Sequence, residues 1–97
     1  MIYMNKLNNI IFLNSYPSLD LHGYDRVAAT LAINDFIKDN IKIGNEFLSI
    51  VHGIGTGILR KQTHETLKQN KNVIDFKQDN LNSGVTLVQI KLEDKYE

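Results

Sequence analysis

Aspartate and histidine side chains that could transfer protons gather in two short runs of this 97-residue sequence. The first run, LDLHG at residues 19–23, has the alternating pattern of a strand. That pattern places Asp20 and His22 on one face, about 6.5–7 Å apart along the strand. An imidazole titrates near pH ~6.5 and can act as a general base or acid. His22 is therefore a candidate for proton transfer, although a histidine before a turn can also serve only to satisfy local backbone groups.

A second run, VHGIGTGILR at residues 51–60, reads as another strand that ends in His-Gly and turns into a helix. Two interpretations of His52 are open: it completes an acid–base pair with His22, or it fixes the glycine loop. The loop glycines permit close approach to a ligand, and free N–H groups at a helix start suit an anion. Arg60 could grip a phosphate with two hydrogen bonds, and the alternative is a tight turn with Arg60 in a surface ion pair.

Several classes of binding site are excluded or left open by the same residues. The dinucleotide pattern Gly-x-Gly-x-x-Gly would need glycine where the sequence has Ile58, and the Gly-Lys-Ser/Thr of a P-loop is missing. Asp20, His22 and His52 have the composition of a two-histidine, one-carboxylate metal site, so a divalent ion stays open as a cofactor but is not predicted. The absence of cysteine excludes disulfides, thiolate metal sites and cysteine nucleophiles.

Hydrophobic periodicity predicts the elements that carry the first run. Residues 19–22 form a strand, and Asp25 is a suitable N-cap for a helix that runs to about Asn40. Gly44 closes this helix in the way that a C-terminal glycine does. The predicted inner stripe of the helix is Ala29, Ile33, Phe36, Ile37 and Ile41.

The second run is carried by a strand and a helix of its own. The nearly continuous apolar run at 47–51 is typical of a parallel strand that is covered on both faces. Thr56 can cap a second helix that extends to about Gln69, and two further strands follow at 73–78 and 85–92. The predicted inner stripe of this helix is Leu59, Thr63 and Leu67.

This element order, β-α-β-α-β-β, predicts a two-layer α/β domain with helices packed on a small sheet. If the first two strands are parallel and adjacent, the first helix supplies their crossover, right-handed by default. Both His-Gly junctions then lie at the same edge of the sheet, which is where open α/β sheets usually bind ligands. The two runs are therefore expected to form one site.

Composition limits the partners and the compartment. Eleven basic and eleven acidic residues give a formal net charge of zero, so the chain as a whole has no excess that favours nucleic acid. Residues 56–77 hold five basic and two acidic residues, which suits either a polyanion or a solvated helix face. His64 lies among polar residues of that segment and is expected to be exposed. No run is long enough for a signal sequence or a membrane span, so we expect a cytoplasmic protein without a membrane partner.

The length of the chain suits a single domain. Residues 1–18 are polar and rich in asparagine, and we expect a lead-in or linker there, with an extra strand at 10–14 as an alternative. Residues 19–92 are expected to be the folded domain, and residues 93–97 a C-terminal tail.

The motif LDLHG before one helix and the motif HGxGTGxLR opening a second helix resemble the Smr (small MutS-related) domain. The likeness covers roughly residues 19–92, and the longer motif is the specific one. Smr domains occur at the C-terminus of bacterial MutS-like proteins, as stand-alone bacterial proteins and in eukaryotic fusions. The resemblance implies a fold similar to the C-terminal domain of translation initiation factor three. It also implies a DNA-nicking endonuclease or an endoribonuclease.

The resemblance implies that the active residues are Asp20, His22, His52 and Arg60. The glycine loop and the basic pair at the start of the second helix supply the nucleic-acid-binding candidates, which are Gly53, Gly55, Thr56, Gly57, Arg60 and Lys61. Two departures from the family pattern could weaken substrate contacts or alter substrate choice. Many members have glutamate where this chain has Ala28, and a glycine-rich loop near residue 80 is reduced here to NLNSG at 80–84.

We therefore expect a phosphodiester-cleaving endonuclease whose partner is nucleic acid, DNA or RNA. Proton transfer would involve Asp20, His22 and His52, while Arg60 and the loop at 53–57 would hold the scissile phosphate. One alternative is a nucleic-acid-binding module of the same fold without turnover. Another is an interaction domain of a larger MutS-like protein, in which case the rest of that protein would be its partner.

Overall fold

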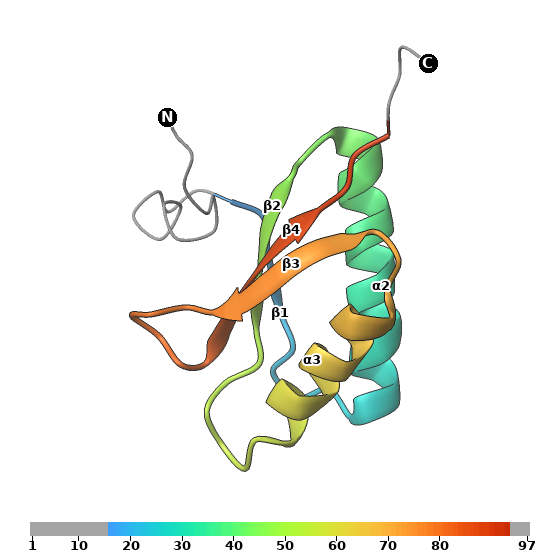
Figure 1. Cartoon of the computed structure of the whole chain (residues 1–97). Helices are drawn as coiled ribbons and strands as arrows, with labels where there is room; N and C mark the ends of the chain where they lie inside the picture. The colour runs from blue at the N-terminus through green and yellow to red at the C-terminus, as the bar shows by residue number, and fades with distance from the viewer. Residues whose placement is uncertain (1–15, 94–97) are drawn as a thin grey trace.

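The computed structural model of the chain describes residues 16–93. Its elements are β1 (Ser18–Asp20), α2 (Arg26–Ile43), β2 (Phe47–Val51), α3 (Ile58–Gln69), β3 (Val73–Gln78) and β4 (Val85–Ile90) (Figure 1). The predicted order of strands and helices is confirmed. The suggested strand at 10–14, most of the expected lead-in and residues 94–97 of the expected tail lie outside the described residues.

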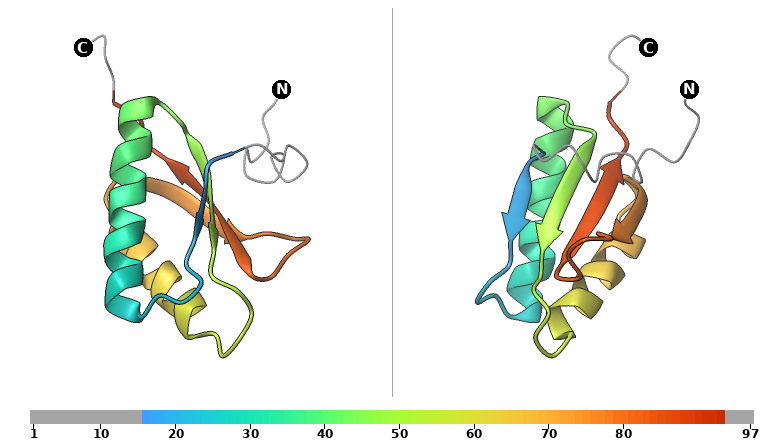
Figure 2. Two further views of the ribbon diagram at one scale, coloured as in Figure 1. Left: turned by 180° about the vertical axis from the view of Figure 1, so that it is seen from behind. Right: turned by 90° about the vertical axis from the view of Figure 1, so that its left-hand side faces the viewer.

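One four-stranded sheet carries both helices on the same face (Figure 2). The strand order is β1-β2-β4-β3, with β1 parallel to β2 and the other neighbours antiparallel. The register pairs Leu19 with Ile50 and Asp20 with Val51. Because β1 and β2 are parallel neighbours, the predicted meeting of the two His-Gly junctions at one sheet edge is confirmed.

The helix α2 buries one stripe of apolar side chains against the sheet. Its N-cap Asp25 accepts a hydrogen bond from the backbone N–H of Ala28 at 2.8 Å. The helix passes the predicted end at Asn40 and stops at Gly44, whose left-handed φ of 95° lets its N–H bond back to the Asn40 carbonyl. The core that it helps to form consists of Leu21, Ala29, Ile33, Ile37, Leu48, Ile50, Leu67, Val88 and Ile90. Within residues 16–93, neither helix is both long and apolar enough to cross a membrane.

Two strands end earlier than predicted, because the backbone beyond their last residues makes other hydrogen bonds. The first strand stops at Asp20, since a turn begins there in which the Tyr24 N–H bonds to the Leu21 carbonyl at 3.0 Å. The last strand stops at Ile90, and the next residue, Lys91, donates its N–H to the carbonyl of Asn72 at 2.7 Å. His22 therefore lies in the turn and not in the strand.

A substitution at the N-cap of α2 tests whether the Asp25 side chain stabilises the helix. Replacing Asp25 with alanine removes the acceptor of the Ala28 N–H, and we expect the free energy of unfolding to fall by about 1 kcal/mol. Asp25→Asn keeps an oxygen acceptor and should stay close to wild type. Urea unfolding of the three proteins gives the comparison, and an alanine variant as stable as the asparagine variant would contradict the assignment.

Candidate functional site

The residues of the two runs line one small hollow at the sheet edge. Asp20 and His22 from the end of β1 and His52 and Gly53 from the end of β2 border a space of about 240 Å³. The turn after β1 and the loop after β2 lie at the same end of the molecule in both Figure 1 and Figure 2. The structure therefore brings together the three residues that were predicted to transfer protons.

Asp20 contacts the backbone of His22 and not its ring. An Asp20 carboxylate oxygen accepts the His22 backbone N–H at 2.9 Å, a local bond that aspartate commonly makes in turns. The predicted arrangement on one strand face is therefore wrong, because the strand ends at Asp20. The His22 side chain is exposed, and its ring has no hydrogen-bond partner within residues 16–93. Its two nitrogens are open to a ligand.

His52 is buried, with 8% of its surface exposed, and both of its ring nitrogens are hydrogen-bonded inside the protein. Its Nδ1 lies 3.0 Å from the carbonyl oxygen of Gly53. A carbonyl only accepts, so Nδ1 carries the hydrogen, and Nε2 of the neutral ring accepts from the Thr86 hydroxyl at 2.8 Å. The loop-fixing contact that was one of the two interpretations of His52 is thus present.

His64 completes this network, so the expectation that it is merely exposed is wrong. Its Nε2 lies 2.9 Å from the same Thr86 oxygen, and its ring meets that of His52 edge-on with centroids 6.0 Å apart. Since the single hydroxyl hydrogen goes to His52, the His64 Nε2–H donates to Thr86. His64 also packs on Phe76, with ring centroids 5.1 Å apart. One feature of the sequence could have indicated this role of His64. Thr86 is a polar residue in an apolar strand, and a buried hydroxyl needs a hydrogen-bond partner.

The environment keeps both imidazoles neutral at neutral pH. Burial lowers the pKa of His52 from its ordinary 6.5, the bond to the Gly53 carbonyl opposes this, and the charge of Arg60 adds to the lowering. Burial likewise lowers the pKa of His64, with further lowering from His52, Arg60 and Lys68. The neutral rings agree with the donor and acceptor pattern around Thr86.

The glycine loop is anchored to the turn before β4. The backbone N–H groups of His52 and Gly53 both donate to the Gly84 carbonyl, at 2.9 and 3.0 Å. A Cβ on Gly84 would lie 3.2 Å from the Gly53 backbone, closer than most Cβ contacts, so glycine at position 84 favours this approach. The final glycine of the segment at 80–84 therefore holds the loop that follows His52.

The start of α3 differs from the prediction. Gly57, with a left-handed φ of 86°, is the N-cap, and the helix begins at Ile58 instead of Thr56. The Thr56 hydroxyl accepts the Ile58 N–H at 3.4 Å, a long bond for a cap. Glycine replaces a side-chain cap here because the chain must turn with positive φ to enter the helix.

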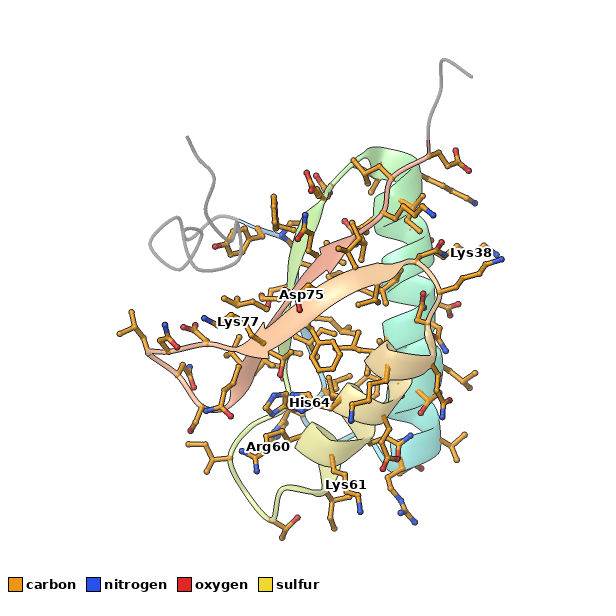
Figure 3. All side chains as sticks on the ribbon, viewed as in Figure 1. Lys38, Arg60, Lys61, His64, Asp75 and Lys77 are labelled. Carbon is orange, nitrogen blue, oxygen red and sulfur yellow. The ribbon has the colours of Figure 1, made fainter. Side chains whose placement is uncertain are left out.

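Arg60 and Lys61 lie on the first turn of α3, next to the loop (Figure 3). Arg60 lines a second hollow of about 190 Å³ together with His52 and residues 54–59 of the loop and helix start. Both side chains are exposed, and Arg60 donates to the Gln78 carboxamide oxygen at 3.3 Å instead of pairing with an acid. His52 therefore borders both hollows, the one lined by Asp20 and His22 and the one lined by Arg60.

A metal centre does not emerge from these residues. In the part of the chain that the structure describes, no group of three histidine, cysteine or acidic side chains is placed to hold a metal ion. The ring nitrogens of His52 already bond to Gly53 and Thr86, so this histidine is poorly suited to complete a ligand set with Asp20 and His22. We assign no metal to the site.

Comparison with known proteins decides the family. The sequence profile of the Smr domain matches residues 19–91. This chain belongs to the Smr family. Endonuclease MutS2 of Brevibacillus brevis is 38% identical over 81 residues, and Endonuclease MutS2 of Clostridium novyi is 34% identical over 77 residues. These matches cover 80% and 76% of the chain but only 10% of each MutS2 protein.

Solved Smr structures share the fold of this Smr domain. The Smr domain of Thermus thermophilus MutS2 superposes with a TM-score of 0.76 at 29% identity, covering 78% of this chain and 99% of that one. YdaL, a stand-alone small MutS-related protein from Escherichia coli, gives a TM-score of 0.73 at 20% identity, covering 88% of this chain and 74% of that one. The chain is therefore an Smr domain related to a region of MutS2 that makes up about a tenth of that protein.

The Thr86 hydroxyl can be tested by an isosteric change. Thr86→Val leaves the His52 Nε2 without its donor and the His64 Nε2–H without its acceptor. We expect the free energy of unfolding to fall by about 1–3 kcal/mol, the usual penalty for an unsatisfied buried polar group. Thr86→Ser keeps the hydroxyl and should lose less. The network would be refuted by urea unfolding curves in which the valine variant is the more stable of the two.

Stability should depend on pH through the same pair. Because the folded protein lowers the pKa of His52 and His64, the unfolded chain binds protons at a higher pH than the folded one. The contribution of the two neutral histidines to the free energy of unfolding should thus be greatest above pH ~6.5, and it should decrease as the pH falls below that value. Urea unfolding between pH 7.5 and 5 measures this, and His64→Gln, which keeps a donor but cannot titrate, should weaken the dependence.

Proposed function

We propose that this Smr domain is a nucleic-acid endonuclease that nicks DNA or cleaves RNA. The observation that carries the proposal is the hollow at the sheet edge, where the exposed His22 lies beside His52 and next to the hollow that Arg60 lines. An accessible imidazole and a cation beside it are the two groups that phosphodiester cleavage needs most. The relation to proteins named Endonuclease MutS2 supports the same conclusion.

In this proposal, His22 takes the proton from the attacking hydroxyl, which is water for DNA or the 2′-hydroxyl for RNA. The new P–O bond forms as the bond to the leaving oxygen breaks, and that oxygen takes a proton from solvent. Arg60 and the loop at 53–57 hold the phosphate and stabilise the charge that develops on it. Lys61 adds a further positive charge beside them.

Asp20 and His52 support His22 in different ways. Asp20 holds the turn that presents His22, because its carboxylate accepts the His22 backbone N–H. His52 holds the glycine loop from behind, because its two nitrogens are engaged by Gly53 and Thr86. Of the three residues predicted to transfer protons, His22 thus meets the substrate, while Asp20 and His52 hold the surrounding backbone in place.

The second candidate function is nucleic-acid binding without turnover. Two observations favour it: Ala28 stands where many Smr members have glutamate, and His52 has no ring nitrogen free to act as a second acid. The interaction with nucleic acid would then rest on Arg60, Lys61 and the loop alone. Association with the rest of a larger MutS-like protein is a further proposal, which the relation to MutS2 supports.

Labelled DNA and RNA hairpins, incubated with and without a chelator, separate the two functions and identify the substrate. We expect His22→Ala to lower the cleavage rate by about 10²–10⁴-fold while the affinity stays within a few-fold of wild type. General acid–base groups change the rate, whereas the positive charge of the phosphate site is untouched.

Asp20→Asn serves as the matched variant, because its amide oxygen can still accept the His22 N–H and keep the turn. We expect a smaller loss of rate than for His22→Ala. Thermal unfolding must show that both variants are folded. A folded His22→Ala protein that cuts at the wild-type rate refutes the acid–base role, and a folded wild type that binds but cuts neither nucleic acid supports the binding module.

A further inference from the structure

A hollow of about 790 Å³ lies away from the candidate site, on the helical side of the domain. It is bounded by the C-terminal half of α2, the turn at 70–72 between α3 and β3, and the segment after β4. Figure 3 shows Lys38 on the upper half of α2, well above Arg60 and Lys61 near the lower end of the helices. The two regions are therefore separate surfaces joined by the length of the helices.

Four lysines from three segments line this hollow, which we call the distal groove. They are Lys38, Lys42, Lys71 and Lys91, and the single acid among the lining residues is Glu93. Since the whole chain has equal numbers of acidic and basic residues, composition alone does not explain why four lysines and one acid gather around this groove. No ion pair within residues 16–93 joins the four lysines to an acid.

Favourable interaction with the negative C-terminal ends of the helices explains little of the positive charge of the four lysines. Lysines near a helix C-terminus are favourable in general, but in α2 only Lys42 lies in the last turn. The lysine in the last turn of α3 is Lys68, which does not line the groove. Lys38, Lys71 and Lys91 therefore need another explanation.

The rim of the distal groove is held in place by hydrogen bonds. The Asn70 side chain donates to the Asn34 oxygen at 2.9 Å and accepts the Asn72 backbone N–H at 2.8 Å. The Lys91 backbone N–H then bonds to the Asn72 carbonyl at 2.7 Å. These bonds fix the backbone that carries Lys71 and Lys91 relative to α2, so the lysines are arranged around the groove before any ligand binds.

We propose that the distal groove binds the phosphodiester backbone of the nucleic acid whose scissile phosphate lies at Arg60, which rests on the proposed function. The helix α3 runs from the Arg60 end to the turn at 70–72 that borders the groove, and its 12 residues span about 18 Å at the usual rise of an α-helix. One phosphate of each duplex strand follows every ~3.4 Å, so a duplex must extend about five base pairs beyond the cut to reach the groove. The lysines thus add affinity only for substrates above a minimum length.

The test compares two sets of changes at the same four positions. Lys→Gln at 38, 42, 71 and 91 removes the charge, and Lys→Arg at the same positions keeps it. Binding is measured by fluorescence anisotropy against salt concentration, with hairpins whose stems have about 4 and about 24 base pairs, in DNA and in RNA. The double variant Arg60→Gln with Lys61→Gln reports on the candidate site itself.

For the long stem we expect the glutamine set to flatten the salt dependence by two to four phosphate contacts, at about 0.9 per contact for duplex DNA. The arginine set should keep the wild-type slope. For the short stem both sets should match wild type, whereas the Arg60 and Lys61 double variant should weaken binding of both stems.

An unchanged slope on the long stem overturns the distal groove and leaves the proposed function intact, provided that the Arg60 and Lys61 variant still weakens binding. A glutamine set that melts at a lower temperature without any change in binding shows that the lysines serve the fold, which also overturns the proposal. A long stem that is bound through the lysines but never cut supports the groove and refutes the nuclease function. A wild-type protein that binds neither stem refutes both.

Discussion

A single hydroxyl group, that of Thr86, determines how three elements meet behind the candidate site. It donates to His52 at the end of β2 and accepts from His64 on α3, while its own strand β4 lies between β2 and β3. Because a hydroxyl has only one hydrogen, this geometry specifies the tautomer of both rings. The position of the glycine loop follows, since the remaining nitrogen of His52 bonds to the Gly53 carbonyl.

The two His-Gly junctions look equivalent along the chain but differ in their environment. His22 follows a strand of three residues at the edge of the sheet and remains exposed. His52 follows a strand with neighbours on both sides, and it is buried. One imidazole is therefore available to a ligand while the other belongs to the scaffold, and the strand order contributes to this division.

Much of the fold could be predicted from the chain, because it depends on local or periodic signals. The apolar stripe of α2, its Asp25 cap and the glycine at Gly44 all act within a few residues. The roles of Thr56 and His64 could not be predicted in this way. The start of α3 depends on the positive φ of Gly57, and the partner of His64 lies 22 residues away on another strand. Periodicity indicates which face is buried but not which polar groups meet there.

The close approach of Gly84 to Gly53 separates the hairpin between β3 and β4 into a constrained and an unconstrained part. The carbonyl of Gly84 accepts two backbone N–H groups, and a Cβ at this position would press on the Gly53 backbone at 3.2 Å. The tip of the hairpin lacks this restriction, and Leu81 there is 74% exposed. Variation in sequence among related domains can therefore accumulate at the tip, which makes this hairpin a natural place to graft new recognition sequences while the glycine loop keeps its shape.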